Sequence, residues 1–309
     1  MSYQGTREAF SAAMEDYAKQ HPETVLISAD SMLAARASGY AERLPHQFVE
    51  VGIAEQCAVD VAVGMAATGM NPVVATYAGF ITMRACEQVR TFVAYPGLNV
   101  KMAGFNSGMI GGEREGVTHQ FYEDIAIIRA MKGIDIICPS DANSAYDATL
   151  AMLASPRACY LRLGNGKEKD VLWEKGAFVP GKVHVRVSYG KMAVLFTHGF
   201  VLPTALKAAK QLHEQGIDIT VVEVHTLTPL DEEGILTWLA QCPVAICYED
   251  HYIYGGLGSA VAQLSAERAN KRVLCMGLRG FAESGTPSSL LHKYQLDEQS
   301  VMQVIKQAL

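Results

Sequence analysis

The sequence lacks basic clusters and long apolar segments, and these absences exclude several classes of partner. Lys and Arg number 26 against 32 Asp and Glu, which gives the 309 residues a formal net charge of −6. A chain with this charge and no basic run is not expected to bind nucleic acid or an anionic membrane surface. No uninterrupted apolar run approaches the roughly 18 residues of a membrane-spanning helix, so no membrane span is expected.

Paired cysteine motifs are also missing. The seven cysteines are an odd number and include no Cys-x-x-Cys. Because most of them lie in apolar segments, we predict reduced core residues of a cytoplasmic protein, with neither disulfides nor a structural zinc site. The start of the chain, residues 1–7, is polar and does not resemble a signal peptide.

Apolar strand-like runs alternate with helical patterns through most of the sequence. Half of the residues are hydrophobic and 19% are charged, which predicts a sizeable core, and 309 residues suffice for two domains. Continuous apolar strands that alternate with helices are typical of a parallel sheet covered on both faces. The sequence therefore predicts an α/β fold of two doubly wound, mostly parallel-sheet domains.

The alternation stops between residues 164 and 189, where glycine, proline and charged residues accumulate. We predict a first domain at 1–165, a linker at 166–190 and a second domain at 191–309. Ligands of open parallel sheets bind beyond the carboxyl ends of the strands. The strand-to-helix junctions of the first domain are therefore expected to meet at one edge of its sheet; they are residues 28–30, 52–55, 77–80, 105–120 and 161–165.

Glu55 lies near the start of an expected helix at 54–68, directly after an expected strand. The residues that follow, 58–72, contain a single charge, Asp60. A carboxylate in such apolar surroundings is costly unless it is hydrogen-bonded, paired or protonated. A glutamate held in this way can share a proton with a ring nitrogen of a cofactor. The alternative is a structural carboxylate that faces the positive end of the helix dipole.

Residues 104–120 form a glycine-rich segment that follows an expected strand. They include five glycines but neither Gly-x-x-x-x-Gly-Lys-Ser/Thr nor Gly-x-Gly-x-x-Gly, so this is not a standard nucleotide-binding loop. Long loops in compact domains are usually functional or mobile. At the end of the segment, His119 in Thr118-His-Gln120 could exchange a proton with a substrate hydroxyl.

Other aromatic and basic residues near these junctions are further candidates. Phe80 begins a helix expected over 80–95, where its ring could stack on a flat cofactor, and Met83 shares its helical face. Arg162 lies at the carboxyl end of a strand, where it could bind a phosphate bidentately. Surface ion pairs are the alternative for this arginine and for Arg84. In the second domain, the segment 248–258 predicts a tight strand–helix turn.

Several of these motifs occur together in a known family. Val51-Gly-Ile-Ala-Glu-Gln56, Tyr77-Ala-Gly-Phe80 and Thr118-His-Gln120 resemble the pyrimidine-binding domain of transketolase, and are similar to 1-deoxyxylulose-5-phosphate synthase. Residues 199–258, with Val224-His-Thr-Leu-Thr-Pro229, resemble the C-terminal domain of the same family. The motifs stand in family order and the resemblance covers essentially the whole chain.

The resemblance implies thiamine diphosphate as the cofactor and the transfer of a two-carbon ketol unit from a ketose to an aldose. It implies that Glu55 bonds a ring nitrogen of the aminopyrimidine and favours its imino tautomer. Phe80 and Met83 would line the pyrimidine pocket, and Asp30 would approach the thiazolium side. Contacts to the oxygens and phosphate of a sugar substrate would come from His119 and Arg162.

The family's Gly-Asp-Gly motif, which holds magnesium, is absent from this sequence. The chain therefore resembles the C-terminal subunit of a split transketolase. The resemblance implies that an N-terminal transketolase subunit carrying Gly-Asp-Gly brings Mg²⁺ and the diphosphate site, in a dimer of two such pairs. The isolated chain is expected to be close to inert.

The segment 112–120 also departs from the family pattern Gly-Glu-Asp-Gly-x-Thr-His-Gln. It is one residue longer and contains an additional arginine, Arg114. Just upstream, Asn106 stands where transketolases often have histidine. Donor and acceptor preference could therefore differ from the common pentose phosphates. Arg114 could bind a phosphate or sulfonate of the substrate, or it could be a solvent-exposed arginine without a role.

Two other functions remain open on the sequence. The beta subunit of a 2-oxo acid dehydrogenase decarboxylase has the same two domains and cofactor, although Ala-Glu-Gln and Thr-His-Gln favour transketolase. A non-catalytic scaffold subunit could use the same fold, but it would have no need of Glu55. A stand-alone deoxyxylulose phosphate synthase is disfavoured, because that enzyme carries a third domain in one chain.

Overall fold

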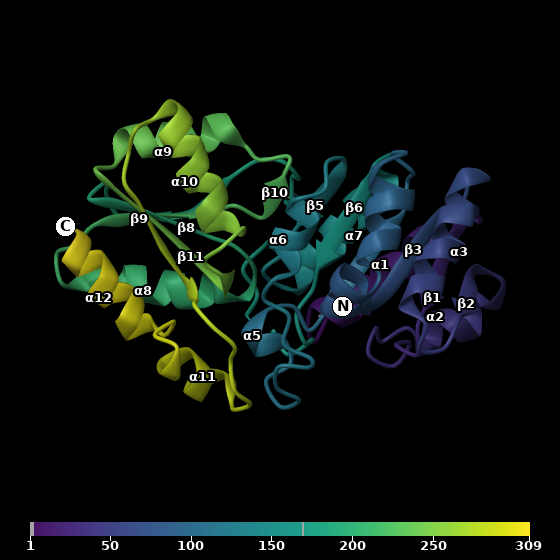
Figure 1. Cartoon of the computed structure of the whole chain (residues 1–309). Coiled ribbons are helices and arrows are strands. Elements are labelled where there is room, and N and C mark those ends of the chain that lie inside the picture. The colour runs from purple at the N-terminus through teal and green to yellow at the C-terminus, as the bar shows by residue number, and fades with distance from the viewer. Residues whose placement is uncertain (1–2, 169) are drawn as a thin grey trace. The chain divides into compact units, whose positions relative to one another are not determined.

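The computed structural model describes residues 3–168 and 170–309; Lys169 of the predicted linker lies outside them. The chain forms two compact units (Figure 1). The first unit consists of Met1–Ser107 with Ile127–Pro180, and the second of Gly108–Ala126 with Gly181–Leu309. Both are α/β units with mostly parallel sheets, as the sequence predicts. No helix in the described residues is long and apolar enough to cross a membrane.

The first unit is built on parallel strands in the order β5–β6–β4–β3–β1–β2. Every residue of β1, β4 and β6 is buried, which explains why these strands read as continuous apolar runs. The strands are β1 (Thr24–Ser28), β2 (Phe48–Glu50), β3 (Asn71–Tyr77), β4 (Lys101–Phe105), β5 (Ile134–Ile137) and β6 (Ala158–Arg162).

Helices cover this sheet and supply its core. Two of them pack together, α1 (Thr6–Ala18) and α7 (Ala142–Ala154), and the ring of Phe10 on α1 meets that of Phe105 edge-on, 5.7 Å between centroids. The shorter elements are α2 (Ser38–Arg43), η1 (Pro45–Gln47) and α6 (Asp124–Arg129). Helix α6 begins among the residues of the second unit and ends among those of the first. The helix predicted at 54–68 is α3 (Glu55–Ala67).

The helix expected over 80–95 is not a regular α-helix. It consists of the π-helical turns η2 (Phe80–Arg84) and η3 (Val89–Ala94) on either side of α4 (Cys86–Gln88). The backbone N–H of Ala85 donates to the carbonyl of Phe80 at 3.2 Å, five residues back. Such widened turns occur frequently at functional sites, and this one carries Phe80 and Arg84.

The second unit has the strand order β12–β11–β8–β9–β7, and only β7 is antiparallel to its neighbour. Helices α9 and α10 lie on one face of the sheet, and α8 and α12 on the other (Figure 1). The elements are α5 (Gly108–Gly111), β7 (His184–Ser188), β8 (Ala193–Thr197), η4 (Gly199–Val201), α8 (Leu202–Glu214), β9 (Ile219–Glu223), β10 (Thr226–Thr228), α9 (Glu232–Gln241), β11 (Val244–Tyr252), α10 (Leu257–Arg268), β12 (Val273–Leu278), α11 (Pro287–Lys293) and α12 (Glu298–Ala308).

Strand β7 lies inside the segment 166–190 that the sequence predicts to be a linker. It pairs with β9 at the edge of the sheet, with His184 opposite Glu223 and Ser188 opposite Thr220. Three of its five residues are exposed, because an edge strand has one open side. The strand therefore lacks the apolar run that identifies the buried strands.

Asp141 ties the first unit together at the start of α7. One of its carboxylate oxygens accepts from the backbone N–H and hydroxyl of Ser144, at 2.8 and 2.6 Å. The other accepts from the backbone N–H groups of Leu172 and Trp173, at 2.6 and 2.8 Å. The residue is fully buried. A single side chain thus caps a helix and fixes the chain that follows β6.

We expect Asp141→Ala to lower the free energy of unfolding by about 2–4 kcal/mol, because it removes a cap and leaves buried N–H donors unpaired. Asp297→Ala is the matched control, since Asp297 caps α12 from a partly exposed position and should cost only about 1 kcal/mol. Urea unfolding followed by circular dichroism measures both. Equal losses in the two variants would contradict the role assigned to Asp141.

Candidate functional site

Glu55 is the first residue of α3, and only 2% of it is exposed. Its two carboxylate oxygens accept from one guanidinium nitrogen of Arg84, Nη1, at 2.8 and 2.7 Å. This ion pair supplies the counter-charge that a buried carboxylate requires. The sequence-based expectation that Glu55 is shielded from water is therefore met in the first unit.

Arg84 also stacks on an aromatic ring. Its guanidinium carbon lies 4.1 Å from the ring centroid of Phe80, within cation–π distance. The side-chain amide of Gln56 donates to the backbone carbonyl of Arg84 at 3.1 Å, which links η2 to the first turn of α3. Glu55, Phe80 and Arg84 form what we call the Glu55 cluster. The sequence identified the first two, whereas Arg84 could only be assigned a surface ion pair.

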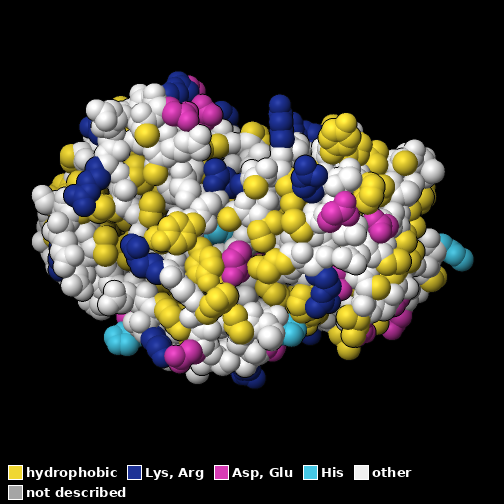
Figure 2. Space-filling view, viewed as in Figure 1, with side chains coloured by type: hydrophobic (Ala, Val, Ile, Leu, Met, Phe, Trp, Pro, Cys, Tyr) yellow, Lys and Arg dark blue, Asp and Glu magenta, His cyan; other side chains and the backbone are white. Residues whose placement is uncertain are grey.

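The surroundings of the Glu55 cluster are unusually apolar for a surface. Met83 is 40% exposed and Ile53 is 74% exposed. In α3, only Glu55, Ala58, Val59 and Ala62 are buried, although most of the helix is apolar. Hydrophobic side chains are visible over this part of the first unit in Figure 2. An exposed apolar face of this kind indicates a surface that another molecule covers.

Asp30 follows β1 and has a left-handed backbone, with φ of 53°, which aspartate tolerates better than most residues. Its side chain is exposed, and its backbone N–H donates to the carboxylate of Glu50 at 2.7 Å. The N–H of Gly52 donates to the same oxygen at 2.9 Å. Desolvation raises the pKa of Glu50, but these hydrogen bonds outweigh it and hold the pKa below its usual value. Glu50 thus joins the end of β1 to the turn before Glu55.

Two predicted substrate-binding residues lie inside the first unit. Asn106 is 4% exposed, and its side-chain oxygen accepts a hydrogen bond from Arg7, which also donates to the carbonyl of Gly164 at 3.0 Å. Arg162 is 1% exposed and lies opposite Gly104 in the β4–β6 pair. A substrate could reach either side chain only if the residues around it moved, so their assignment stays a prediction.

From Gly108 on, the glycine-rich segment belongs to the second unit, whereas the sequence patterns predict it as part of the first domain. The carboxylate of Asp250 on β11 accepts from the backbone N–H of Met109 at 2.8 Å. The N–H of Tyr252 donates to the carbonyl of Tyr122 at 2.9 Å. An added Cβ at Gly108 would lie 2.2 Å from the Asp250 carboxylate, so only glycine fits there. These contacts join residues more than a hundred positions apart, which no local pattern reveals.

The tip of the segment is held against residues 283–285. The N–H of Gly285 donates to the carbonyl of Glu113 at 2.8 Å, and the amide of Gln120 donates to the carbonyl of Glu283 at 3.0 Å. This leaves Arg114 exposed and His119 partly exposed. The imidazole Nδ1 of His119 lies 3.0 Å from the hydroxyl of Thr118. The predicted site residues therefore fall into two groups, one on each unit.

The turn that the sequence predicts between β11 and α10 is present. Glu249 is 1% exposed, and its carboxylate accepts from the backbone N–H groups of Leu257 and Gly258, both at 2.8 Å. Desolvation raises the pKa of Glu249, but the side chain of His198 and the other donors outweigh it and lower the pKa. This carboxylate holds the start of α10 and is structural. Nowhere in the described residues do three His, Cys, Asp or Glu side chains gather to hold a metal.

Comparison with known proteins assigns both units to known domain families. The transketolase pyrimidine-binding domain matches residues 2–167, and the transketolase C-terminal domain matches residues 181–301. A transketolase C-terminal section from Methanocaldococcus jannaschii is 32% identical, over 99% of this chain and 97% of its own. A 6-deoxy-6-sulfo-D-fructose transketolase subunit from Clostridium is 32% identical, over 96% of this chain and 92% of its own.

A solved structure agrees with these matches. A split-gene transketolase, described as an inactive beta4 tetramer, is 30% identical and superposes with a TM-score of 0.89 over 100% of this chain and 99% of its own. The two α/β units, in this order, are those that the sequence motifs predicted. The chain therefore belongs to the transketolase family, of which it carries the pyrimidine-binding domain followed by the C-terminal domain.

Proposed function

We propose that this chain is the C-terminal subunit of a two-component transketolase. With thiamine diphosphate, the enzyme would transfer a two-carbon ketol unit from a ketose donor to an aldose acceptor. The observation that carries the proposal is the buried carboxylate of Glu55, which lies at a helix N-terminus beside the partly exposed ring of Phe80. Family membership supports it.

The residues of the Glu55 cluster fit an aminopyrimidine ring. Glu55 offers a carboxylate shielded from water, Phe80 offers a ring face for stacking, and Met83 offers a half-exposed apolar side chain. Asp30, at the carboxyl end of a neighbouring strand, would contact the thiazolium side. When bound, thiamine diphosphate supplies the carbon centre that accepts the two-carbon unit and passes it on.

The way in which Glu55 is paired distinguishes it from structural carboxylates of the same chain. Asp141, Glu249 and Asp250 accept hydrogen bonds from backbone N–H groups, which cannot move away. Within residues 3–168 and 170–309, Glu55 is paired only with the side chain of Arg84, which is 45% exposed. A carboxylate oxygen can accept more than one hydrogen bond, so Glu55 can bind a ring nitrogen while Arg84 keeps it in place.

A companion polypeptide would complete the site. The chain has no Gly-Asp-Gly, so we propose that an N-terminal subunit binds Mg²⁺ and the diphosphate, and that the isolated chain is inactive. The exposed apolar face of α3 supports assembly at this end of the first unit. Two such pairs would form a dimer of heterodimers, in a cytoplasmic enzyme.

The altered loop bears on the choice of substrate. Arg114 is exposed at its tip, and His119 is close enough to the surface to contact substrate oxygens. One relative is named for a sulfonated sugar, 6-deoxy-6-sulfo-D-fructose. We therefore propose that Arg114 binds the anionic group of a phosphorylated or sulfonated sugar, through charge-assisted hydrogen bonds.

Glu55→Gln should abolish most ketol transfer when the variant is mixed with the companion subunit, because a neutral amide cannot share the proton of a ring nitrogen in the same way. We expect a loss of at least about 100-fold in kcat, a typical size for proton-transfer groups. Size-exclusion chromatography should show unchanged assembly. Turnover close to that of the unaltered pair would refute the proposed mechanism.

Arg84→Gln should release the Glu55 carboxylate from its fixed position and, because a buried charge loses its partner, should also lower the free energy of unfolding. Misplacement of a reacting group by about 1 Å can cost roughly 100-fold in rate, so we expect kcat to fall 10- to 100-fold and the KM for thiamine diphosphate to rise. Arg90→Gln, in the neighbouring turn η3, is the control and should change neither constant. Kinetic constants within twofold of the unaltered pair would show that Arg84 is only a surface arginine.

Arg114→Ala should discriminate between anionic and neutral donors. A hydrogen bond to a charged group contributes about 1.5–3 kcal/mol, which corresponds to a rise of roughly 10- to 100-fold in the KM for a phosphorylated or sulfonated ketose. The KM for the same ketose without its anionic group should change little. Steady-state kinetics with the two donors measure both KM values. An equal change in the two KM values would exclude Arg114 from binding the anionic group of the substrate.

A further inference from the structure

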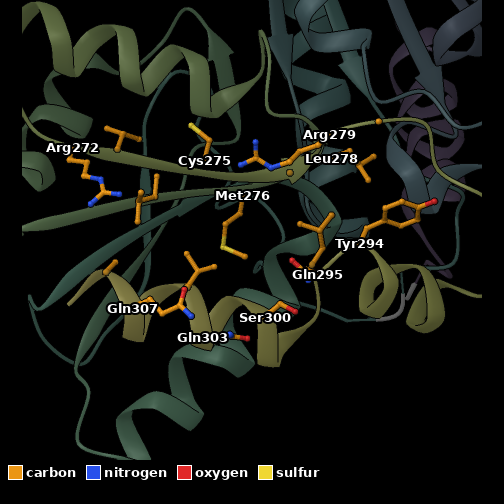
Figure 3. A pocket seen from close by; sticks show the side chains of 17 residues that line it. Arg272, Cys275, Met276, Leu278, Arg279, Tyr294, Gln295, Ser300, Gln303 and Gln307 are labelled. Atoms are coloured by element: carbon orange, nitrogen blue, oxygen red, sulfur yellow. The ribbon is translucent and has the colours of Figure 1, made fainter.

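A groove in the second unit has no part in the site described above. It has a volume of about 820 Å³ and runs between β12 and α12 (Figure 3). Strand β12 is the last strand of its sheet and, among the described strands, pairs only with β11. Its other edge therefore carries backbone N–H and C=O groups that no strand in the described chain pairs.

The charges around this groove have one sign. None of its lining residues is acidic, although acidic residues outnumber basic ones in the chain. Arg272 and Arg279 stand at opposite ends of β12 (Figure 3). Both are exposed, and within residues 3–168 and 170–309 neither has an ion-pair or hydrogen-bond partner through its guanidinium group. The groove therefore favours the binding of a negatively charged molecule.

The spacing of the two arginines indicates the shape of that occupant. They are seven positions apart, which corresponds to roughly 23 Å along a strand at about 3.3 Å per residue. They cannot converge on one phosphate or carboxylate. An elongated molecule with negative charge at both ends can contact both.

Helix α12 forms the other wall of the groove and offers hydrogen-bonding side chains. Gln303, Gln307 and Ser300 extend from α12 toward the groove, and Met276 points toward them from β12 (Figure 3). Gln303 and Gln307 are exposed, and their amides have no hydrogen-bond partner in the described part of the chain. Free amides beside a free strand edge suit a polypeptide backbone, which supplies donors and acceptors at regular intervals.

A second copy of β12 is a poor occupant. In a symmetric antiparallel pair centred on Cys275, Lys271 of each copy would face Arg279 of the other. Like charges directly opposite each other destabilise a strand pair. Such edge charges are a known protection against pairing between identical sheets.

We propose that this groove, formed by β12 and α12, binds an extended segment of a partner polypeptide that adds a strand to β12. The segment carries acidic side chains about seven residues apart, which pair with Arg272 and Arg279. The proposal does not depend on the proposed catalytic function, because it rests on the second unit alone.

A labelled eight-residue peptide with aspartate at both ends, and alternating valine and threonine between, is a direct probe. Its charges match the two arginines in either strand direction. Fluorescence anisotropy with the full chain should show binding at least 10-fold tighter than that of the same peptide with lysine at both ends. Binding of the aspartate peptide should weaken as the salt concentration rises.

The double variant R272E/R279E should reverse this preference, so that the lysine peptide binds at least 10-fold tighter than the aspartate peptide. Both positions are exposed, so an unchanged melting temperature is expected and confirms the fold. Lys210→Glu, an exposed position on α8, is the control and should leave both affinities unchanged.

Three results would overturn the proposal. The first is the absence of any binding of the aspartate peptide up to millimolar concentration. The second is equal binding of both peptides to the unaltered chain or to the double variant. The third is a change in the self-association of the chain on R272E/R279E substitution, measured by analytical ultracentrifugation, because it would make a second copy the occupant.

Discussion

The ion pair between Glu55 and Arg84 is the interaction on which the first unit's site depends. A carboxylate that is almost fully buried at the start of α3 would be strongly unfavourable without a counter-charge. Arg84 supplies that charge across 2.7–2.8 Å, while its guanidinium group lies on the ring of Phe80. The pair thus fixes two features at once, the orientation of the carboxylate and the position of the aromatic ring.

Several other buried charged groups of the chain are held by hydrogen bonds to the backbone. Lys101 is fully buried, and its ammonium group donates to the carbonyl of Ser155 at 2.7 Å; burial lowers the pKa of Lys101 to about 8. Asp141 and Glu249 are likewise satisfied by the backbone. Charged groups that bond to the backbone stabilise the fold, because a ligand cannot replace their backbone partners. The half-exposed side chain that pairs with Glu55 leaves room for a ligand to take part.

The glycine-rich segment shows a second constraint, the close approach of two chain segments. Gly112 lies so near His119 that an added Cβ would be 1.9 Å from the carbonyl oxygen of that residue. Gly108 has the same relation to Asp250. Glycines in this segment therefore allow tight packing, and the packed segment leaves Arg114 exposed. A loop of this composition is ordered here by distant partners and not by its own propensity.

Much of the architecture could be predicted from local patterns. Buried parallel strands give continuous apolar runs, as the fully buried strands β1, β4 and β6 do, so the α/β fold could be predicted from the sequence. Strand β7 was missed because an exposed edge strand has no such run. The helix over 80–95 was predicted as regular, since side-chain periodicity does not reveal a turn widened by one residue.

The sequence by itself determined the alternation of buried strands and helices, the family, and the position of Glu55 at a strand-to-helix junction. These depend on neighbours within a few residues, whose periodicity and motifs can be read directly. Only the tertiary structure decided which side chain neutralises Glu55 and with which unit residues 108–126 pack. The deciding contacts join positions 29 and 141 residues apart, and such contacts form only when the whole chain has folded.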